Sequence, residues 1–232
     1  MLFELNSPQN HQKTTARMKW MEQLQFTNWF PATSCALAAY LLGCFTVGYY
    51  LVRARTDKDI HEIGSGSVGA RNVGRILGKS GFVITLLCDS GKGALAVWLA
   101  QEWTNNGHVA LLAMLAVVCG HIWPIQLRFR GGKGVATSFG ALLMFDYRVA
   151  LTILVLFLGG FAVTRKSLFP AMFAFVCLPL VGWFFKHSNS TMALLAVLSA
   201  AILFAHRKNL ADEFAALGAH RAVTPKSKQP RL

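Results

Sequence analysis

A lysine set among three glycines is the part of this 232-residue sequence that most clearly suggests chemistry. The stretch RFRGGKGVAT places Gly131, Gly132 and Gly134 around Lys133 and leads to Thr137, with an apolar run on each side. Glycines let backbone amides approach an anion closely, and amides at a helix N-terminus bind phosphate. We therefore predict that this segment opens a helix and binds phosphate through its backbone, the lysine ammonium and the threonine hydroxyl.

A second glycine-rich stretch, GSGSVG, contains Ser65 and Gly66 and matches the pattern G-x-G-x-x-G. A dinucleotide-binding fold requires a strand just before this pattern, and the preceding RTDKDIHEI is charged and does not alternate, so that fold is excluded. Arg71, Arg75 and Lys79 follow at spacings of four and are expected to share one helix face. Two interpretations stay open: an anion site, or a basic flank of a membrane segment.

Further polar residues lie within or beside apolar runs. Asp89 and Lys92 are three residues apart in DSGKG, so they are expected to pair on a helix, while the glycines allow close helix approach. His121 is interpreted as a hydrogen-bonded spacer before the lysine loop. His206 and Asn209 are also three apart, in HRKN after the last apolar run, where they belong either to a basic flank or to the site.

The elements that must position these residues are membrane helices. The chain is 54% hydrophobic and 14% charged, and residues 29–52 and 107–127 contain no charged residue. A helix of about 20 apolar residues crosses the hydrocarbon core, so we predict an all-α polytopic membrane protein. The five cysteines lie in apolar runs without metal-site spacing, and we expect no disulfide, no metal and no cofactor.

Charge bias predicts how often the chain crosses the membrane. Seven crossings place 17 lysines and arginines on one side of the membrane and five on the other. If the fourth apolar segment does not cross, each side carries 11. The positive-inside rule therefore favours about seven short helices, with the N-terminus outside and the C-terminus in the cytoplasm. The same rule explains the net charge of +13, so no nucleic-acid partner is expected. The seven apolar segments are 29–52, 80–100, 108–127, 134–145, 148–163, 168–185 and 191–205.

All of the polar patches then fall on or near the cytoplasmic side. Their position at the edge of a bilayer indicates substrates that combine phosphate groups with a lipid chain. For domain organisation, we predict a polar N-terminal extension over 1–28, a single transmembrane domain over 29–213, and a basic tail without structure over 214–232.

Taken in order, the patches resemble the bacterial acyl-phosphate:glycerol-3-phosphate acyltransferases, the PlsY family. That family shows GSGNxGATNxxR, DxxKG, GHxxPxxxxFxGGKGVAT and a final HRxN, which here read GSGSVGARNVGR, DSGKG, GHIWPIQLRFRGGKGVAT and HRKN. The resemblance covers roughly residues 35–217. It implies seven short helices and transfer of a fatty acyl group from acyl phosphate to the 1-hydroxyl of glycerol 3-phosphate. The implied location is the bacterial inner membrane with a cytoplasmic active site, and we expect a monomer without metal or cofactor.

By this resemblance Ser65, Arg75, Lys133, His206 and Asn209 match phosphate- and substrate-binding positions of the family. We predict Lys133, His206 and Asn209 as catalytic residues and Asp89, Lys92 and His121 as supporting residues. The proton acceptor stays open between His206 and a substrate phosphate oxygen. The predicted substrate- and phosphate-binding residues are Ser65, Gly66, Arg71, Asn72, Arg75, Gly131, Gly132, Gly134, Thr137 and Ser167.

The sequence also departs from the family pattern. Ser67 stands where the family has Asn, and Arg71 stands where it has Thr. Phe169 lies where a second serine is usual, and Ala219 replaces a common glutamate. These departures suggest one alternative to the acyltransferase hypothesis, an inactive lipid-binding paralogue. A second alternative is an organic-phosphate transporter, because broken helices and intramembrane charge also suit a substrate path.

Overall fold

The computed structural model describes residues 29–223, and within that range the chain forms helices and loops but no strand. The predictions for residues 1–28 and 224–232 lie outside the described residues. The long helices are α2 (Trp29–Cys44), α3 (Val47–Thr56), α4 (Ala70–Thr104), α5 (Gly107–Ile122), α6 (Val135–Phe145), α7 (Tyr147–Thr164), α8 (Leu168–Phe184) and α9 (Asn189–Val223). Two short 3-10 helices, η1 (Ile60–Glu62) and η2 (Ile125–Leu127), lie in loops.

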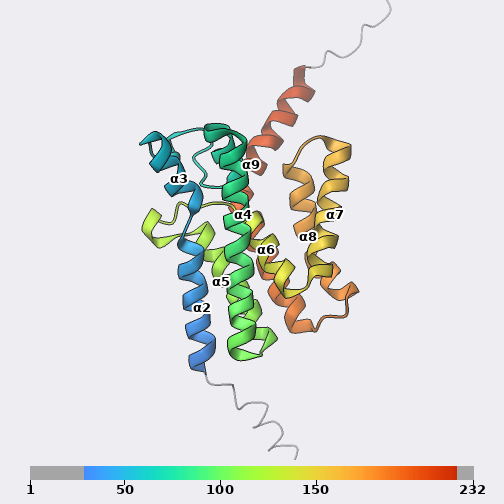
Figure 1. The fold of residues 1–232 in the computed structure, drawn as a ribbon. Coiled ribbons are helices and arrows are strands. Elements are labelled where there is room, and N and C mark those ends of the chain that lie inside the picture. The colour runs from blue at the N-terminus through green and yellow to red at the C-terminus, as the bar shows by residue number, and fades with distance from the viewer. Residues whose placement is uncertain (1–28, 224–232) are drawn as a thin grey trace, which may run out of the picture.

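The helices run up and down through one bundle (Figure 1). Helix α2 packs on α5, and α4 packs on α6. Helices α7 and α8 form an antiparallel pair on the other side of the bundle, joined to it through α6 and α9. The most buried of the long helices is α5. The glycine-rich loops are therefore attached at both ends to helices that pack against one another.

Close backbone contacts hold the first half of the bundle together. A Cβ on Gly93 of α4 would lie 2.1 Å from the Thr137 carbonyl oxygen, and one on Gly140 of α6 would lie 1.9 Å from the Ser90 carbonyl oxygen. Small residues let membrane helices approach to this distance, where van der Waals packing stabilises their association. The prediction that the glycines of DSGKG allow close helix approach is confirmed for Gly93, whereas a Cβ on Gly91 would meet no atom within 4 Å.

Three helix boundaries differ from the expected segments. The chain leaves the helix at Phe45 and Thr46, so the expected first span consists of α2 and α3. Helix α4 begins ten residues earlier than expected and bends at Gly78, where φ is 75°. Helix α9 runs past residue 213, where we expected a tail without structure, because the sequence after it is rich in alanine, which favours helix.

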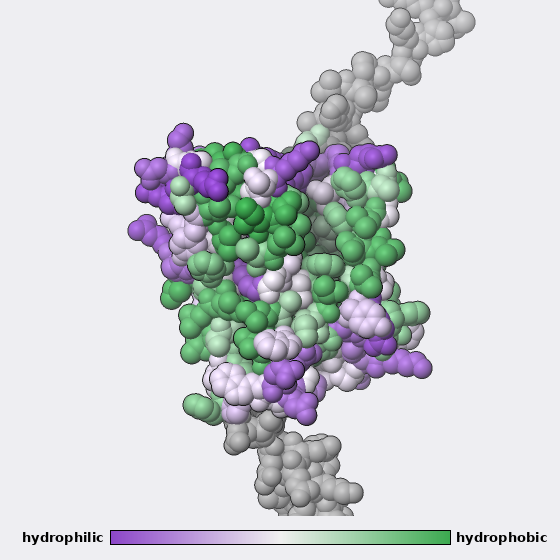
Figure 2. Space-filling model, in the orientation of Figure 1, coloured by the Kyte–Doolittle hydropathy of each residue, from purple (hydrophilic) through white to green (hydrophobic). Residues whose placement is uncertain are grey.

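Within residues 29–223, five segments are long and apolar enough to cross a membrane, and α6 and α8 are shorter apolar helices. With a rise of 1.5 Å per residue, the 11 residues of α6 extend only about 16 Å. Figure 2 shows apolar side chains over the middle of the visible face, with hydrophilic ones gathered toward both ends. The all-helical membrane class is confirmed, whereas the number of crossings and their orientation stay predictions.

Candidate active site

The loop that carries Lys133 folds back over the end of α5. The Gly131 N–H donates to the Ile122 carbonyl oxygen at 3.1 Å, and the Gly132 N–H donates to the His121 carbonyl oxygen at 3.0 Å. Helix α6 then starts after Gly134, whose φ of 77° favours glycine. The lysine is thus placed between a loop fixed to α5 and the N-terminus of α6, as the sequence predicted.

Gly132 is required for a reason other than the one we expected. A Cβ at this position would lie 2.0 Å from Nε2 of His121, so the loop backbone rests directly on the imidazole. We expected the glycine to leave room for the anion. The structure shows instead that it leaves room for the histidine ring underneath.

The imidazole of His121 belongs to a buried cluster of charged groups. Nζ of Lys92 lies 2.9 Å from Oδ1 of Asp89 and 2.9 Å from Nδ1 of His121. An ammonium only donates, so Nδ1 is the acceptor and the neutral ring carries its proton on Nε2. Lys92 also donates to the carbonyl oxygens of Gly43 and Phe45, at the break between α2 and α3. The predicted pair of Asp89 and Lys92 is therefore present. Lys92 connects the break between α2 and α3 to the ring beneath the lysine loop, and α4 stays helical at both residues.

The loop that carries Ser65 is held by Asn72. The Ser65 N–H donates to Oδ1 of Asn72 at 2.9 Å, and Nδ2 donates to the carbonyl oxygens of Ile63 and Ser67. The amide is 2% exposed, and all three bonds stay within this loop and the helix that follows it. Asn72 was predicted to bind phosphate, and the structure assigns its side chain to shaping the loop instead.

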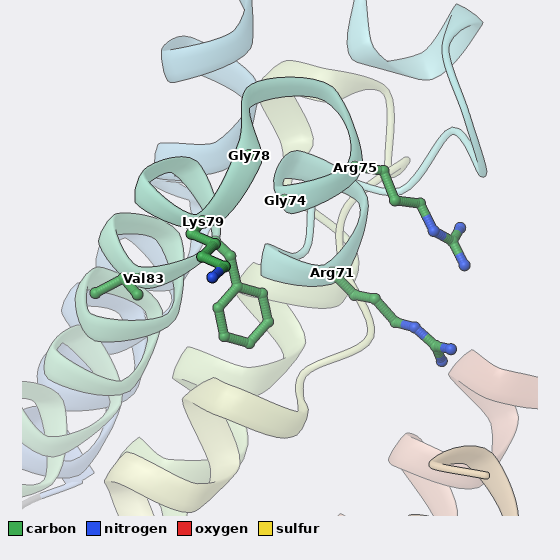
Figure 3. A pocket seen from close by; sticks show the side chains of 7 residues that line it. Arg71, Gly74, Arg75, Gly78, Lys79 and Val83 are labelled. Carbon is green, nitrogen blue, oxygen red and sulfur yellow. The ribbon is translucent and has the colours of Figure 1, made fainter. Parts of the chain in front are cut away.

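The three cations at the start of α4 do not share one face, because the bend at Gly78 interrupts the helical spacing. Figure 3 shows Arg71 and Arg75 projecting to one side, with Lys79 on the other side of Gly74. A hollow of about 570 Å³ lies between them. Nη1 of Arg71 donates to Oγ of Ser167 at 2.8 Å, which brings together two predicted binding residues that are 96 positions apart.

A cavity of about 1040 Å³ joins most of the predicted site residues. Its polar lining comes from the helix ends and loops, and its apolar lining comes from α6, α7 and α8. Such a cavity suits a molecule that has an anionic head and an apolar chain. The predicted residues that line it are Ser65, Arg71, Asn72, Arg75, Asp89, His121, Lys133, Gly134, Ser167, His206 and Asn209.

Gly66, Gly131, Gly132, Lys92 and Thr137 do not line this cavity. The Thr137 side chain is fully buried, on the helix whose backbone packs against Gly93 of α4. The hydroxyl that we expected to bind an anion is thus buried outside the cavity lining, and it has no hydrogen-bond partner within residues 29–223.

Lys133 is half-buried beside two other cations. Burial lowers the pKa of its ammonium, Arg71 and Arg75 lower it further, and Asp212 acts in the opposite direction. No hydrogen bond or ion pair within residues 29–223 occupies the ammonium of Lys133 or the guanidinium of Arg75. A bound phosphate would relieve the repulsion between these groups.

His206 presents one nitrogen to the cavity. Its Nδ1 lies 2.9 Å from the carbonyl oxygen of Ile202, one turn earlier in α9, and can only donate to it. In the neutral ring, Nε2 is then an acceptor. The side chain is 6% exposed and lines the cavity together with Asn209, and Nε2 is the ring nitrogen not bonded to α9.

Two acidic residues of the cavity were missed from the sequence. Asp212 and Glu213 line it from α9, and Glu213 pairs with Lys166 in the loop between α7 and α8. A signal for them was available, since they lie three and four positions after Asn209 and so extend the same helix face. They provide negative charge opposite the cations.

Comparisons with known proteins agree with this arrangement. A family model described as glycerol-3-phosphate acyltransferase matches residues 33–216. Glycerol-3-phosphate acyltransferase 1 of Desulfitobacterium hafniense (strain Y51) is 42% identical over 176 residues, which are 76% of this chain and 87% of the relative.

The fold is similar to crystal structures of PlsY (YgiH), an integral membrane glycerol 3-phosphate acyltransferase. The glycerol 3-phosphate form has a TM-score of 0.75 and 31% identity, and the lysophosphatidic acid form has a TM-score of 0.72 and 30% identity. Each covers 80% of this chain and 92% of the other. With a family model that spans most of the described helices and a relative of this identity, the chain belongs to the glycerol-3-phosphate acyltransferase family.

Proposed function

We propose that this protein transfers a fatty acyl group from acyl phosphate to the 1-hydroxyl of glycerol 3-phosphate. The products are 1-acylglycerol 3-phosphate and inorganic phosphate. The observation that carries the proposal is the single cavity in which Ser65, Arg75 and Lys133, from separate segments, meet His206 and apolar walls. The family membership and the glycerol 3-phosphate form of the similar structure support it.

The residues suit a reaction that needs positioning rather than a covalent nucleophile. Acyl phosphate is already activated, so the hydroxyl oxygen attacks the acyl carbon directly and the bond from that carbon to the phosphate oxygen breaks. The hydroxyl proton goes to Nε2 of His206 or to a phosphate oxygen, and phosphate leaves as an anion. Lys133 and Arg75 hold the two anions and offset the negative charge that develops.

The apolar part of the cavity accounts for the other half of the donor. Phe139 of α6, Phe157 of α7 and Phe175 of α8 line it. A hydrocarbon chain placed against them loses contact with water, which favours binding by about 25 cal/mol per Å² of apolar surface buried. We assign the acyl chain to these walls and the phosphates to the loops.

The remaining predictions belong to the same proposal. The active site lies on the cytoplasmic side of a bacterial inner membrane, the enzyme works as a monomer, and the catalytic domain starts at residue 29. The charge asymmetry of the loops supports the orientation.

A matched pair of arginines tests the function. Purified protein in detergent is given palmitoyl phosphate and labelled glycerol 3-phosphate, and lysophosphatidate is measured. Arg75→Ala removes a cation of the cavity and should raise KM about ten- to a hundredfold, the value of a charged hydrogen bond. Arg53→Ala removes an exposed arginine that pairs with the exposed Asp57 at 3.7 Å, and should change little.

Two results would overturn the assignment. One is wild-type protein that releases no lysophosphatidate but carries labelled glycerol 3-phosphate into proteoliposomes, which would establish the transporter. The other is an equal, mild effect of both arginine substitutions, which would make the loop a basic flank.

A further inference from the structure

His61 connects the two glycine-rich loops of the site. It lies in η1, four residues before Ser65, and its carbonyl oxygen would lie 3.0 Å from a Cβ on Gly66. On the other side, Nε2 of its ring lies 2.6 Å from the carbonyl oxygen of Arg130, three residues before Lys133. The backbone of His61 therefore packs beneath the turn at Gly66 of the first loop, and its side chain contacts the second loop.

Both nitrogens of this ring face hydrogen-bond acceptors. Nδ1 lies 2.8 Å from Oδ1 of Asp59, and the carbonyl oxygen of Arg130 can only accept. A neutral imidazole donates through one nitrogen only, so it cannot serve both partners. Because an acceptor lies within hydrogen-bond distance of each nitrogen, the geometry fits the doubly protonated imidazolium.

The surroundings of His61 favour a positive charge. Asp59 also accepts from the backbone N–H of His61, and this bond, with smaller effects of the ring and of Arg130, lowers the pKa of the carboxyl group. The carboxylate is therefore ionised at neutral pH. Tyr49 of α3 also faces the ring, with ring centroids 5.7 Å apart, and the charge of Arg130 acts on Asp59. The His61 side chain is only 7% exposed, so water does not replace either partner freely.

We propose that protonated His61 acts as a charged clasp that positions the Lys133 loop against the Ser65 loop. His61 does not line the cavity, so it is a positioning residue rather than a catalytic one. The clasp needs its ring charged and Asp59 ionised. A neutral ring would donate to only one of the two acceptors, so the other hydrogen bond would be lost and the loops would separate. This inference rests on the proposed acyl transfer.

Two substitutions of His61, one that keeps the charge and one that removes it, test this role. His61→Arg keeps a cation with several N–H donors at every relevant pH, whereas His61→Gln is neutral throughout. His108, exposed in the first turn of α5, serves as the matched control, because His108→Arg makes the same change away from either loop. All proteins are purified in detergent, and kcat/KM for glycerol 3-phosphate is measured from about pH 6 to pH 9, across the range where histidine titrates.

The proposal predicts that the ratio of His61→Arg to wild type rises about tenfold with pH, the value of one charge-assisted hydrogen bond. The ratio of His108→Arg to wild type should stay flat. Wild type should exceed His61→Gln at the acid end, and the two should converge as pH rises. If size exclusion shows that His61→Arg is not folded, the convergence of wild type and His61→Gln with rising pH decides whether the proposal holds.

A flat ratio for folded His61→Arg, or a His61→Gln variant as active as wild type at the acid end, would overturn the clasp. Both results presuppose an active wild type. If wild type transfers no acyl group, the proposed function fails and the clasp is then judged by titrating glycerol 3-phosphate calorimetrically. The clasp would be refuted if the affinities of wild type and His61→Gln differ by the same factor at every pH.

Discussion

Adding a single methyl group at Gly132 should damage the enzyme without changing any charge. A Cβ there lies 2.0 Å from Nε2 of His121, whereas ordinary contacts begin at 3.4 Å, so either the ring or the loop must move by about 1.4 Å. The ring cannot retreat easily, because Lys92 holds its Nδ1 at 2.9 Å and is itself bonded to two backbone carbonyls. The loop must therefore lift, and Lys133 moves with it.

A misplacement of about 1 Å at a reacting centre can lower the rate about a hundredfold, which corresponds to about 2.7 kcal/mol. We expect Gly132→Ala to lower kcat/KM for glycerol 3-phosphate by that factor, with a folded protein by size exclusion. Gly91→Ala is the control, because a Cβ at Gly91 has no atom within 4 Å and the change sits within regular helix. Lysophosphatidate formation in detergent is the readout for both.

Activity of Gly132→Ala within about threefold of wild type would refute the reasoning, since the calculated clash would then relax at almost no cost. A suppressor gives a second check. Replacing His121 with Ala removes the group that the new methyl meets. The double variant should therefore be more active than the two single effects predict, because contacting residues couple.

The remaining predictions concern charge and orientation. Burial and neighbouring arginines lower the pKa of Lys133, so KM for glycerol 3-phosphate should rise at alkaline pH as the ammonium is lost, and Arg75→Ala should shift this rise to higher pH. Arg148 and other donors lower the pKa of Asp146 to about 2, so its stabilising contribution is complete above its ordinary pKa of 3.8 and is lost as pH falls toward 2. Asp146→Asn should lower Tm by about 2–4 °C at neutral pH and lose that acid dependence, as thermal scans can show. Cysteines placed at Arg130 and Asn105 should label from opposite sides of the membrane, and labelling from one side would contradict seven crossings.

Hydropathy predicted those helices whose ends coincide with the ends of an apolar run. The expected segment 148–163 agrees with α7 within a residue at each end. The start of α4 was missed because its first turns, ARNVGRILGK, are polar and lie beyond the apolar run, so the hydropathy pattern carries no sign of helix there. The α2–α3 break was missed as well. It is stabilised by Lys92 from another helix, a contact that no local pattern reveals.

The site was predictable where residue type alone indicates chemistry, as for Lys133 and Arg75, which line one cavity as expected. The site was less predictable where the orientation of a side chain decides whether it can reach the cavity. Thr137 and Asn72 have suitable side chains, but one is buried against a neighbouring helix and the other is bonded within its loop. The link from His61 to the lysine loop joins residues 69 positions apart, and only the folded loops bring them together.

Three parts of the cavity are oriented by groups that do not themselves carry the chemistry. Asn72 shapes the loop of Ser65, the ring of His121 supports the lysine loop, and the carbonyl oxygen of Ile202 fixes which nitrogen of His206 accepts. An activated donor such as acyl phosphate needs no covalent nucleophile, so the rate depends mainly on how accurately two anions and a hydroxyl are placed. We therefore expect substitutions of the buried groups beneath the loops to lower the rate as strongly as substitutions of Lys133 or Arg75.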